Sequence, residues 1–556
     1  MDAKRAKRAG ASEEEIQAAK RVQQALDALP NMSNEDVNMV DNGQAGETEP
    51  QVPAMPSPVA AKTFKHDGYV VFFGFGGVAE CTLPVLIKHL ELPPERIIII
   101  DMLDKSEVLA KWIESGVTFV QKQIVEENYL DILDTYLDTG DILIDVCYDV
   151  SCIELLKYVR EHKILYINTS VEEWNFFEGF DKRTPYEKSL YARHQEIYDE
   201  IKSWGENNGT TAVLNMGANP GLISHFMKQG LLDLAKAKKV KTEILAARND
   251  YATIAEELGV KVVLDTERDT QIAIRPKEVD EFVGTWSVLG LVEEATSPVE
   301  MGWGTHENKM PEHATVPRVG PKNQIFLSQM GMNTLMRGFV PADPKDLITE
   351  GEERTDGYEI VGNNIRHAEA DTISSFLTTK DGKYRPTVYY CYCPSDVTVA
   401  SMREFAANNY CNDNDRKPYR QRILYENDIL SGADTLGVMI GGYDEKHVWW
   451  CGSSLNIEDA RNLCPLQNAT TIQVAAGVVA GVCWMLENPS RGVVQPEDLD
   501  TEFVLKLAKP YLGSFISKEF EWSPAKNYVN SYEERKDAEI DKKNLWAFSN
   551  FLARNC

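Results

Sequence analysis

Carboxylates and indole rings recur together in one part of this sequence, between residues 267 and 307. An indole face attracts a cation and nearby carboxylates neutralise its charge, so this combination suits an alkylammonium group. Taken singly, each tryptophan could equally be a core residue and each acid a solvated one. As a set, they predict a site for a small molecule with cationic amines. The clusters are residues 267–271, 285–288, 293–294 and 302–307, which include Glu267, Trp286, Glu294 and Trp303.

A glycine-rich turn lies upstream, where the sequence from residue 74 to residue 80 is GFGGVAE. An apolar stretch precedes it and a helical pattern follows, which gives a G-x-G-x-x-A form of the dinucleotide fingerprint. Gly74, Gly76 and Gly77 permit a tight turn and a close backbone approach to a pyrophosphate at the helix N-terminus. Asp101 ends the next apolar stretch, near the expected spacing of about 20 residues, where a carboxylate binds the ribose hydroxyls of NAD and repels the extra phosphate of NADP. The sequence therefore predicts an NAD site.

Short apolar strands alternate with helical stretches from residue 69 onward, and this alternation positions both sites. It predicts an α/β fold, a Rossmann-type doubly wound parallel sheet. Longer, less regular strands after residue 221 predict a second, α+β domain for substrate binding and dimerisation. The expected strands cover residues 69–74, 96–101, 117–121, 141–146, 164–168 and 211–214, and the expected helices cover residues 78–89, 126–137, 151–161, 185–204 and 222–237.

Four segments are expected along the chain. Residues 1–60 lack a core-forming pattern, so they are predicted to be a disordered or linker-like extension. Residues 61–220 are predicted to form the NAD-binding domain and residues 221–455 the α+β domain. Residues 456–556 are predicted to be helical, and their apolar helix is expected to pack back on the first domain.

The composition argues against several function classes. Asp and Glu number 86 against 58 Lys and Arg, so the formal net charge of −28 repels nucleic acids and anionic membranes. The longest apolar stretch is shorter than the roughly 20 residues that span a bilayer. Ten cysteines without a C-x-x-C pair indicate reduced thiols, and no targeting signal is evident, so a cytoplasmic protein is expected. Neither the histidine spacing nor a known motif indicates a metal site.

Several separated motifs resemble those of the bacterial homospermidine synthases, which are relatives of the saccharopine and carboxynorspermidine dehydrogenases. The resemblance covers about residues 64–550. Each motif is unspecific alone, but the set is specific. Ala79 replaces the third glycine of the full fingerprint, and residues 1–60 have no counterpart in the family. Besides the turn and clusters above, the motifs are residues 166–174 (YINTSVEEW), 219–221 (NPG), 434–438 (DTLGV) and 467–470 (QNAT).

The resemblance implies a reaction that transfers an aminobutyl group from putrescine or spermidine to another putrescine and releases ammonia, with no net redox change. It implies NAD as a bound hydride carrier, diamines as the small-molecule partners, and a homodimer. It also implies roles for individual residues. Trp286 is expected to be a cation–π platform, and Glu267 and Glu294 are expected to hold ammonium groups or transfer protons. Asn219 is expected to orient the amine, and His367 is expected to be an active-site histidine. Substrate binding is expected of Glu172 and Asp434, and cofactor binding of Thr169 and Ser170.

Two other functions remain open from the sequence. The chain could be a saccharopine- or carboxynorspermidine-type dehydrogenase, or a non-catalytic NAD-binding scaffold that kept the fold. Saccharopine-type enzymes need cationic side chains for the carboxylates of their substrates. The motif region offers mainly acids and indoles, with Arg268 as a possible ion-pair partner, and this favours a substrate without carboxylates.

Overall fold

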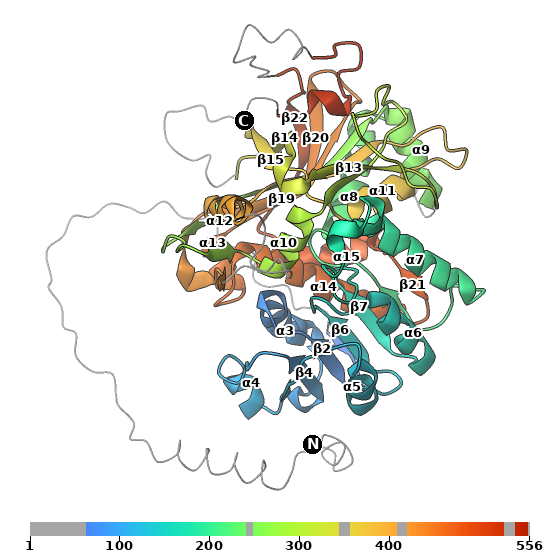
Figure 1. The fold of residues 1–556 in the computed structure, drawn as a ribbon. Coiled ribbons are helices and arrows are strands. Elements are labelled where there is room, and N and C mark those ends of the chain that lie inside the picture. The colour runs from blue at the N-terminus through green and yellow to red at the C-terminus, as the bar shows by residue number, and fades with distance from the viewer. Residues whose placement is uncertain (1–62, 241–247, 344–355, 409–419, 527–539, 554–556) are drawn as a thin grey trace, which may run out of the picture.

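The computed structural model describes residues 63–240, 248–343, 356–408, 420–526 and 540–553. The predicted extension at residues 1–60 lies outside these ranges. The described residues form two large sheets, and Figure 1 shows the parallel sheet in the lower half of the view, in blue and teal except for β21.

The first sheet has seven parallel strands in the order β21-β8-β7-β6-β2-β4-β5. Each strand predicted between residues 69 and 214 is present. The predicted α/β class with a Rossmann-type doubly wound sheet is confirmed. The strands are β2 Val70–Phe73, β4 Ile97–Asp101, β5 Thr118–Gln121, β6 Ile142–Asp145, β7 Leu165–Asn168, β8 Ala212–Val213 and β21 Val493–Val494.

Both faces of this sheet are buried, which explains why its strands are continuous apolar runs. On β2, Val70 and Phe72 belong to one core, while Val71 and Phe73 belong to the core on the opposite face. The sheet is therefore sandwiched between helical layers. The helices of this part of the chain are α3 Gly77–His89, α4 Ala110–Glu114, α5 Tyr129–Tyr136, α6 Cys152–His162 and α7 Leu190–Ser203.

The second sheet is mixed, as expected for an α+β domain. Its main path runs β13-β12-β16-β9-β19-β20-β22, with β14 and β15 attached through β16, and β16 is parallel to β9. The strands are β9 Val262–Asp269, β12 Pro298–Gly302, β13 Gln324–Met330, β14 Leu335–Pro341, β15 Gly357–Asn363, β16 Thr387–Cys393, β19 Ala433–Gly441, β20 His447–Asn456 and β22 Ser514–Glu521.

Further helices and three small ribbons lie mostly in the second domain. The helices are α8 Leu222–Ala237, α9 Arg248–Leu258, α10 Val288–Thr296, α11 Glu369–Phe376, α12 Asp396–Ala407 and α13 Ile457–Leu463. Three two-stranded ribbons pair β1 Phe64–Lys65 with β3 Leu90–Glu91, β10 Ile272–Ala273 with β18 Ile429–Ser431, and β11 Glu281–Gly284 with β17 Arg420–Ile423. The β1–β3 ribbon belongs to the first domain and α13 to the C-terminal part.

The C-terminal part of the chain joins the two sheets. Helix α14 (Ala469–Glu487) contacts α3 and strands of both sheets, and Figure 1 shows it between them. It is long and apolar enough to cross a membrane, but 89% of its most apolar window is buried inside the fold. Helix α15 (Thr501–Ala508) packs on α14. Strands β21 and β22 extend the first and second sheets, so this part is not purely helical, while the four-segment division stays a prediction.

Candidate active site

A cavity of about 140 Å³ lies where the two domains meet, at the carboxyl edge of the parallel sheet. Ligands of open α/β sheets bind at this edge. The segments that follow β6 and β7 form one side, and β9, β16 and α10 form the other. The residues that line it are Val78, Val146, Cys147, Tyr148, Thr169, Ser170, Glu172, Gly217, Asn219, Pro220, Glu267, Trp286, Ser287, Gly290, Glu294, His367, Tyr390, Thr470 and Val474.

Most of the residues singled out in the sequence meet in this cavity. All five proposed catalytic residues line it, as do three of the proposed binding residues. Asp434, Asp101 and the three fingerprint glycines Gly74, Gly76 and Gly77 do not line it. The lining residues predicted from sequence are Trp286, Glu267, Glu294, Asn219, His367, Glu172, Thr169 and Ser170.

A tight loop after β8 positions Asn219. Gly221 has a φ of +131°, and a Cβ there would lie 2.3 Å from the carbonyl oxygen of Gly217, so only glycine fits. Helix α14 presses on the same loop, since a Cβ on Gly477 would lie 2.0 Å from that oxygen. The buried helix therefore fixes the loop that carries Asn219 into the cavity.

The carboxylate of Glu267 is held by two hydrogen bonds. The Asn219 side chain donates its Nδ2–H to Glu267 Oε2 at 2.7 Å, and the Tyr390 hydroxyl donates to the same oxygen at 2.5 Å. Asn219 Nδ2 also lies 3.3 Å from Oδ2 of Asp265. Glu267 and Asp265 are on the same face of β9, while Tyr390 comes from the neighbouring strand β16. The sheet thus places an amide, a phenol and a carboxylate together.

Trp286 and Glu294 come from the segment between β11 and the end of α10. Ser287 caps α10, because its Oγ accepts the Gly290 N–H at 3.1 Å. A Cβ on Gly290 would lie 3.0 Å from Cζ3 of Trp286, so this glycine lets the helix approach the indole. Glu294 lies one helical turn beyond Gly290, and both line the cavity.

His367 carries a positive charge among carboxylates. Its Nδ1–H donates to Glu369 Oε2 at 2.5 Å. Burial lowers the pKa of His367, but the nearby Glu369, Glu294 and Asp265 outweigh this effect and raise the pKa to about 10. Asp265, His367 and Glu369 are close enough to hold a metal ion, with ligand atoms within 4.8 Å of one another. The sequence spacing did not reveal this cluster, which contains the His367–Glu369 ion pair.

The cavity carboxyls titrate near neutral pH. Burial raises the pKa of Glu267 to about 7, against the hydrogen bonds from Tyr390 and Asn219. Burial also raises the pKa of Glu294 to about 7. The pKa of Glu172 is raised to about 8 by burial and by Glu293. These groups can therefore exchange protons at physiological pH and can be ionised by a bound cation.

Asp434 lies behind the cavity. It is 1% exposed, and Gln473 Nε2 donates to its Oδ2 at 3.2 Å. Burial raises its pKa well above the ordinary value, and Glu267 and Asp269 raise it further. In this structure Asp434 is therefore a buried neighbour of Glu267, and direct contact with a substrate stays a prediction.

The glycine-rich turn has the shape that a dinucleotide needs. Gly74 has a φ of +83°, and a Cβ there would lie 3.0 Å from the carbonyl oxygen of Val146. A Cβ on Gly76 would meet no atom within 4 Å, so this backbone borders open space. Helix α3 begins at Gly77, and no side chain caps its first turn. Its free N–H groups can bind a pyrophosphate there.

Asp101 lies beside this turn, at the end of β4. Its Oδ2 accepts the Phe75 backbone N–H at 2.6 Å, and its Oδ1 accepts the Leu103 N–H at 2.7 Å. Each carboxylate oxygen can accept a second hydrogen bond. The carboxylate is therefore fixed against the turn and can also accept from ribose hydroxyls, which fits the predicted role.

One acid and indole cluster has another role. Trp303 is buried and packs edge-on against Phe548, and Glu307 Oε1 accepts from Thr387 and from the Phe548 N–H at 3.0 Å. Residues 302–307 therefore anchor the C-terminal segment and do not line the cavity, so their assignment to the amine site was wrong. Glu293 likewise faces away and pairs with Arg193 at 2.8 Å.

Two tyrosines of the cavity were missed in the sequence, besides several small and apolar lining residues. Tyr148 follows β6 at the carboxyl edge, so the rule that ligands bind there could have found it. Tyr390 lies within an aromatic strand, and only the pairing of β16 with β9 places it beside Glu267. No signal local to its own segment indicates that contact.

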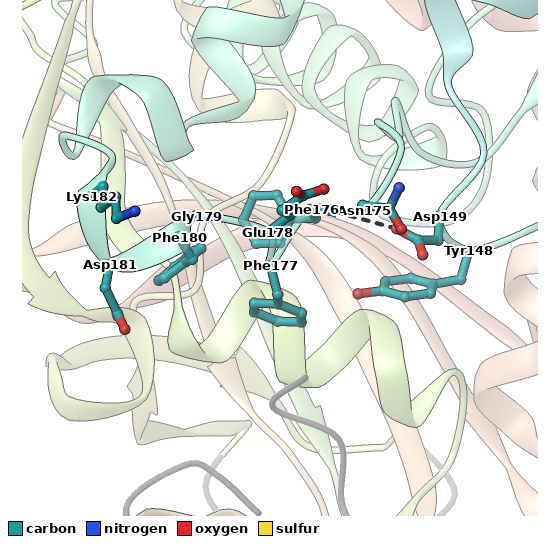
Figure 2. A pocket seen from close by; sticks show the side chains of 10 residues that line it. All are labelled: Tyr148, Asp149, Asn175, Phe176, Phe177, Glu178, Gly179, Phe180, Asp181 and Lys182. Carbon is teal, nitrogen blue, oxygen red and sulfur yellow. Dashed lines mark hydrogen bonds between the residues drawn. The ribbon is translucent and has the colours of Figure 1, made fainter. Parts of the chain in front are cut away.

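A wider hollow of about 620 Å³ shares Tyr148 with the cavity. Figure 2 shows its aromatic rings, among them Phe177 and Phe180, together with the carboxylates of Asp149, Glu178 and Asp181. Lys182 is the one lysine or arginine in its described lining. The described lining of this hollow therefore carries more carboxylates than cationic side chains, which favours cations.

Comparisons with known domain families match both halves of the chain. Residues 70–213 match the saccharopine dehydrogenase NADP binding domain. Residues 217–519 match the saccharopine dehydrogenase C-terminal domain. The division between the two matches falls at the loop that carries Asn219.

Whole proteins match over most of their length. The chain is 35% identical to the homospermidine synthase of Blastochloris viridis, over 88% of this chain and 98% of the relative. It is 34% identical to that of Mesorhizobium japonicum, over 88% and 96%. The crystal structure of the Legionella pneumophila homospermidine synthase in complex with NAD superposes with a TM-score of 0.77 and 33% identity, covering 89% of this chain and 100% of that one. The resemblance found in the sequence is confirmed, and this chain belongs to the homospermidine synthase family.

Proposed function

We propose that this chain transfers an aminobutyl group from putrescine or spermidine to a second putrescine, forms homospermidine and releases ammonia, with NAD as a bound cofactor. The observation that carries this proposal is the composition of the cavity. Three carboxylates and an indole line it, and none of its described lining residues is a lysine or an arginine. A small molecule with two ammonium ends and no carboxylate suits this lining.

The cofactor would be held by the turn at Gly74, Gly76 and Gly77, by Thr169 and Ser170, and by Asp101 at its ribose. The Asp101 carboxylate favours NAD over NADP, because a 2′-phosphate would be repelled there. When bound, NAD accepts a hydride from the amine carbon and returns it to the imine that the second diamine has formed.

The residues of the chain handle charge and protons. Glu267, with a pKa of about 7, can take a proton from an ammonium group and return it to the departing ammonia. Because the Asn219 Nδ2 donates to carboxylates, its carbonyl oxygen is the atom that would accept an amine N–H. Glu294 and Glu172 would hold the distal ammonium groups, and the Trp286 face would stabilise the iminium charge.

The structure offers little to a substrate with carboxylates. Arg268, the cation near the motif region, donates to the carbonyl oxygen of Pro394 at 2.9 Å and lies 3.3 Å from Asp396 Oδ1. It is not among the lining residues. His367 is cationic, but Glu369 neutralises it. A saccharopine-type substrate would therefore lack a free partner for its carboxylates among the described lining residues.

The partners of the protein are proposed to be diamines, with no nucleic acid and no membrane, since the net charge of −28 repels both phosphate surfaces. We further propose a cytoplasmic homodimer. Light scattering on the full chain tests the dimer, for which a mass near twice 62.6 kDa is expected.

An isotope experiment tests the reaction. The full chain with NAD is given an equal mixture of unlabelled putrescine and putrescine deuterated at both amine-bearing carbons. If the hydride returns to the carbon that it left, every homospermidine carries an even number of deuterons and no NADH accumulates. Products with odd deuterium content would indicate exchange through free NADH, stoichiometric NADH would indicate a dehydrogenase, and binding of NAD without product would indicate a scaffold.

A further inference from the structure

Tyr392 lies next to the indole of Trp286 without reaching the cavity. The Trp286 Nε1–H donates to the Tyr392 hydroxyl oxygen at 3.3 Å. Tyr392 is 2% exposed and is not among the cavity residues, whereas Trp286 is partly exposed and lines it. Tyr392 therefore has contact with the aromatic platform and none with the space that a substrate would fill.

The other end of the indole is also fixed. The first turn of α10 packs against its six-membered ring at Gly290, as described above. The residue before the indole is anchored too, because Thr285 Oγ1 donates to Asp269 at 3.0 Å and Asn468 Nδ2 donates to the Thr285 carbonyl oxygen at 2.7 Å. These contacts fix the backbone and one ring edge, and the hydrogen bond to Tyr392 fixes the ring's rotation.

Strand β16 joins this contact to the carboxylate of the cavity. Tyr390 and Tyr392 lie on one face of the strand, and their rings are parallel within 18°, with centroids 5.2 Å apart. Tyr390 donates to Glu267, and Tyr392 accepts from Trp286. Two stacked phenols on one rigid strand thus set the spacing between an anion and an aromatic face.

The orientation of an indole matters for a cation. The cation is attracted to the ring face and not to its edge, so a rotated ring loses the interaction. Rotation about the Cβ–Cγ bond of tryptophan has only broad preferences, so an external contact has to select the angle. The indole N–H can only donate, and a phenol oxygen that accepts it selects one angle.

We propose that Tyr392 is a positioning residue for the reaction, which holds the face of Trp286 toward the cavity by accepting its N–H. This inference rests on the proposed function, because it takes the cation–π platform as the working surface. It adds a residue that no substrate touches, and it predicts that the hydroxyl of Tyr392 matters only when residue 286 carries an indole N–H.

The test is a double-mutant cycle with Tyr392→Phe and Trp286→Phe. Tyr392→Phe removes the acceptor and keeps the ring stack. We expect kcat for homospermidine formation to fall about tenfold, with KM for putrescine changed by less than about twofold, because an unpaired indole N–H no longer fixes the ring. In the Trp286→Phe background, which lacks the N–H, the same substitution should change kcat by less than about twofold.

Tyr389→Phe is the matched control. Tyr389 is on the same strand, is equally buried, and faces the opposite core, where its hydroxyl has no hydrogen-bond partner among the described residues. This variant should keep the wild-type kcat. An equal loss from Tyr392→Phe in both backgrounds would overturn the proposal, since Tyr392 would then act without the indole. An unchanged kcat in the single variant would overturn it as well.

A spectroscopic measurement keeps the proposal testable if Tyr392→Phe is poorly active for other reasons. Protein labelled with ¹⁵N-tryptophan gives one indole N–H signal per tryptophan, and the signal missing in Trp286→Phe identifies residue 286. We expect Tyr392→Phe to shift that signal upfield while the other indole signals stay in place. An unmoved signal would overturn the contact itself. Because this readout needs no turnover, it separates failure of this inference from failure of the proposed reaction.

Discussion

Binding of putrescine is expected to release protons from the three carboxyl groups that line the cavity, Glu267, Glu294 and Glu172. Burial holds the pKa of Glu267 and of Glu294 at about 7. At pH 6.5 each of these two carboxyls is therefore about three-quarters protonated in the free protein. Burial and Glu293 raise the pKa of Glu172 to about 8, so this carboxyl is almost fully protonated at pH 6.5. A diammonium ion stabilises the ionised forms, so complex formation should release about 2.5 protons at pH 6.5 and fewer than about one above pH 8.

The same linkage sets the pH dependence of affinity. The ionised fraction of a group with a pKa of about 7 falls about tenfold between pH 8 and pH 6. Putrescine stays doubly protonated in this range, because lysine-like amines lose their protons only near pH 10. The free protein therefore binds more protons than the complex, and affinity should rise with pH, by about tenfold for one contacting carboxylate and about 100-fold for two.

Calorimetry of protein loaded with NADH measures this without turnover, because NADH cannot oxidise the amine. Titrations at pH 6.5 in phosphate and in bis-Tris buffer differ in heat by the number of protons released multiplied by the difference between the ionisation enthalpies of the two buffers. Glu294→Gln should lower that number by about 0.8. Glu307→Gln is the matched control, because burial also raises the pKa of Glu307 to about 7 but this group lies at the C-terminal segment. Equal heats in the two buffers, or an affinity that is flat from pH 6 to pH 8, would refute the reasoning.

Three further outcomes are expected. Trp286→Ala should keep NAD binding and lower kcat by about 30-fold or more, because a desolvated cation–π contact is worth about 2 kcal/mol. Wild-type turnover of this variant in steady-state assays would show that the indole is not part of the site. Asp101→Ala should lower the affinity for NAD about tenfold in a fluorescence titration. Asp104 is a turn carboxylate nearby, and Asp104→Ala should leave that affinity unchanged. Equal affinities in the two variants would remove Asp101 from the ribose site. The pKa of His367 is raised to about 10 in the folded protein, so the folded protein keeps a proton on this side chain that the unfolded chain loses near pH 6.5. The loss of stability in His367→Asn, measured by denaturant unfolding, should therefore be largest below pH 6.5 and shrink toward pH 10. A loss that grows with pH would contradict this.

The first sheet could be predicted from the sequence because its strands are buried on both faces. The run of four isoleucines in β4 is of this kind, and it ends in Asp101 at the edge where the cofactor is expected. Strand β21 could not be predicted, since two valines have no periodicity of their own and their position depends on the pairing with β8. A pairing partner hundreds of residues away leaves no local trace.

The candidate site was predicted in part, and there is a physical reason why some of its residues could be predicted and others could not. Residues at strand ends and in recurring motifs, such as Glu267 and Trp286, could be named, since their types suit the chemistry. Tyr390 and Tyr392 could not, because their roles arise from the register between β16 and β9. The cluster at Glu307 looked the same in composition as the true site, and only its packing against Phe548 separates the two.

The origin of β21 has a consequence for how the protein is made. The edge of the parallel sheet beside β8 stays bare until residues 493 and 494 have left the ribosome. At about 5–20 residues per second, translation of the intervening chain takes roughly 15 to 55 seconds. During that interval the loop with Asn219 also lacks the helix that presses on it, so the nascent chain completes neither this sheet edge nor this loop until the C-terminal part has been made.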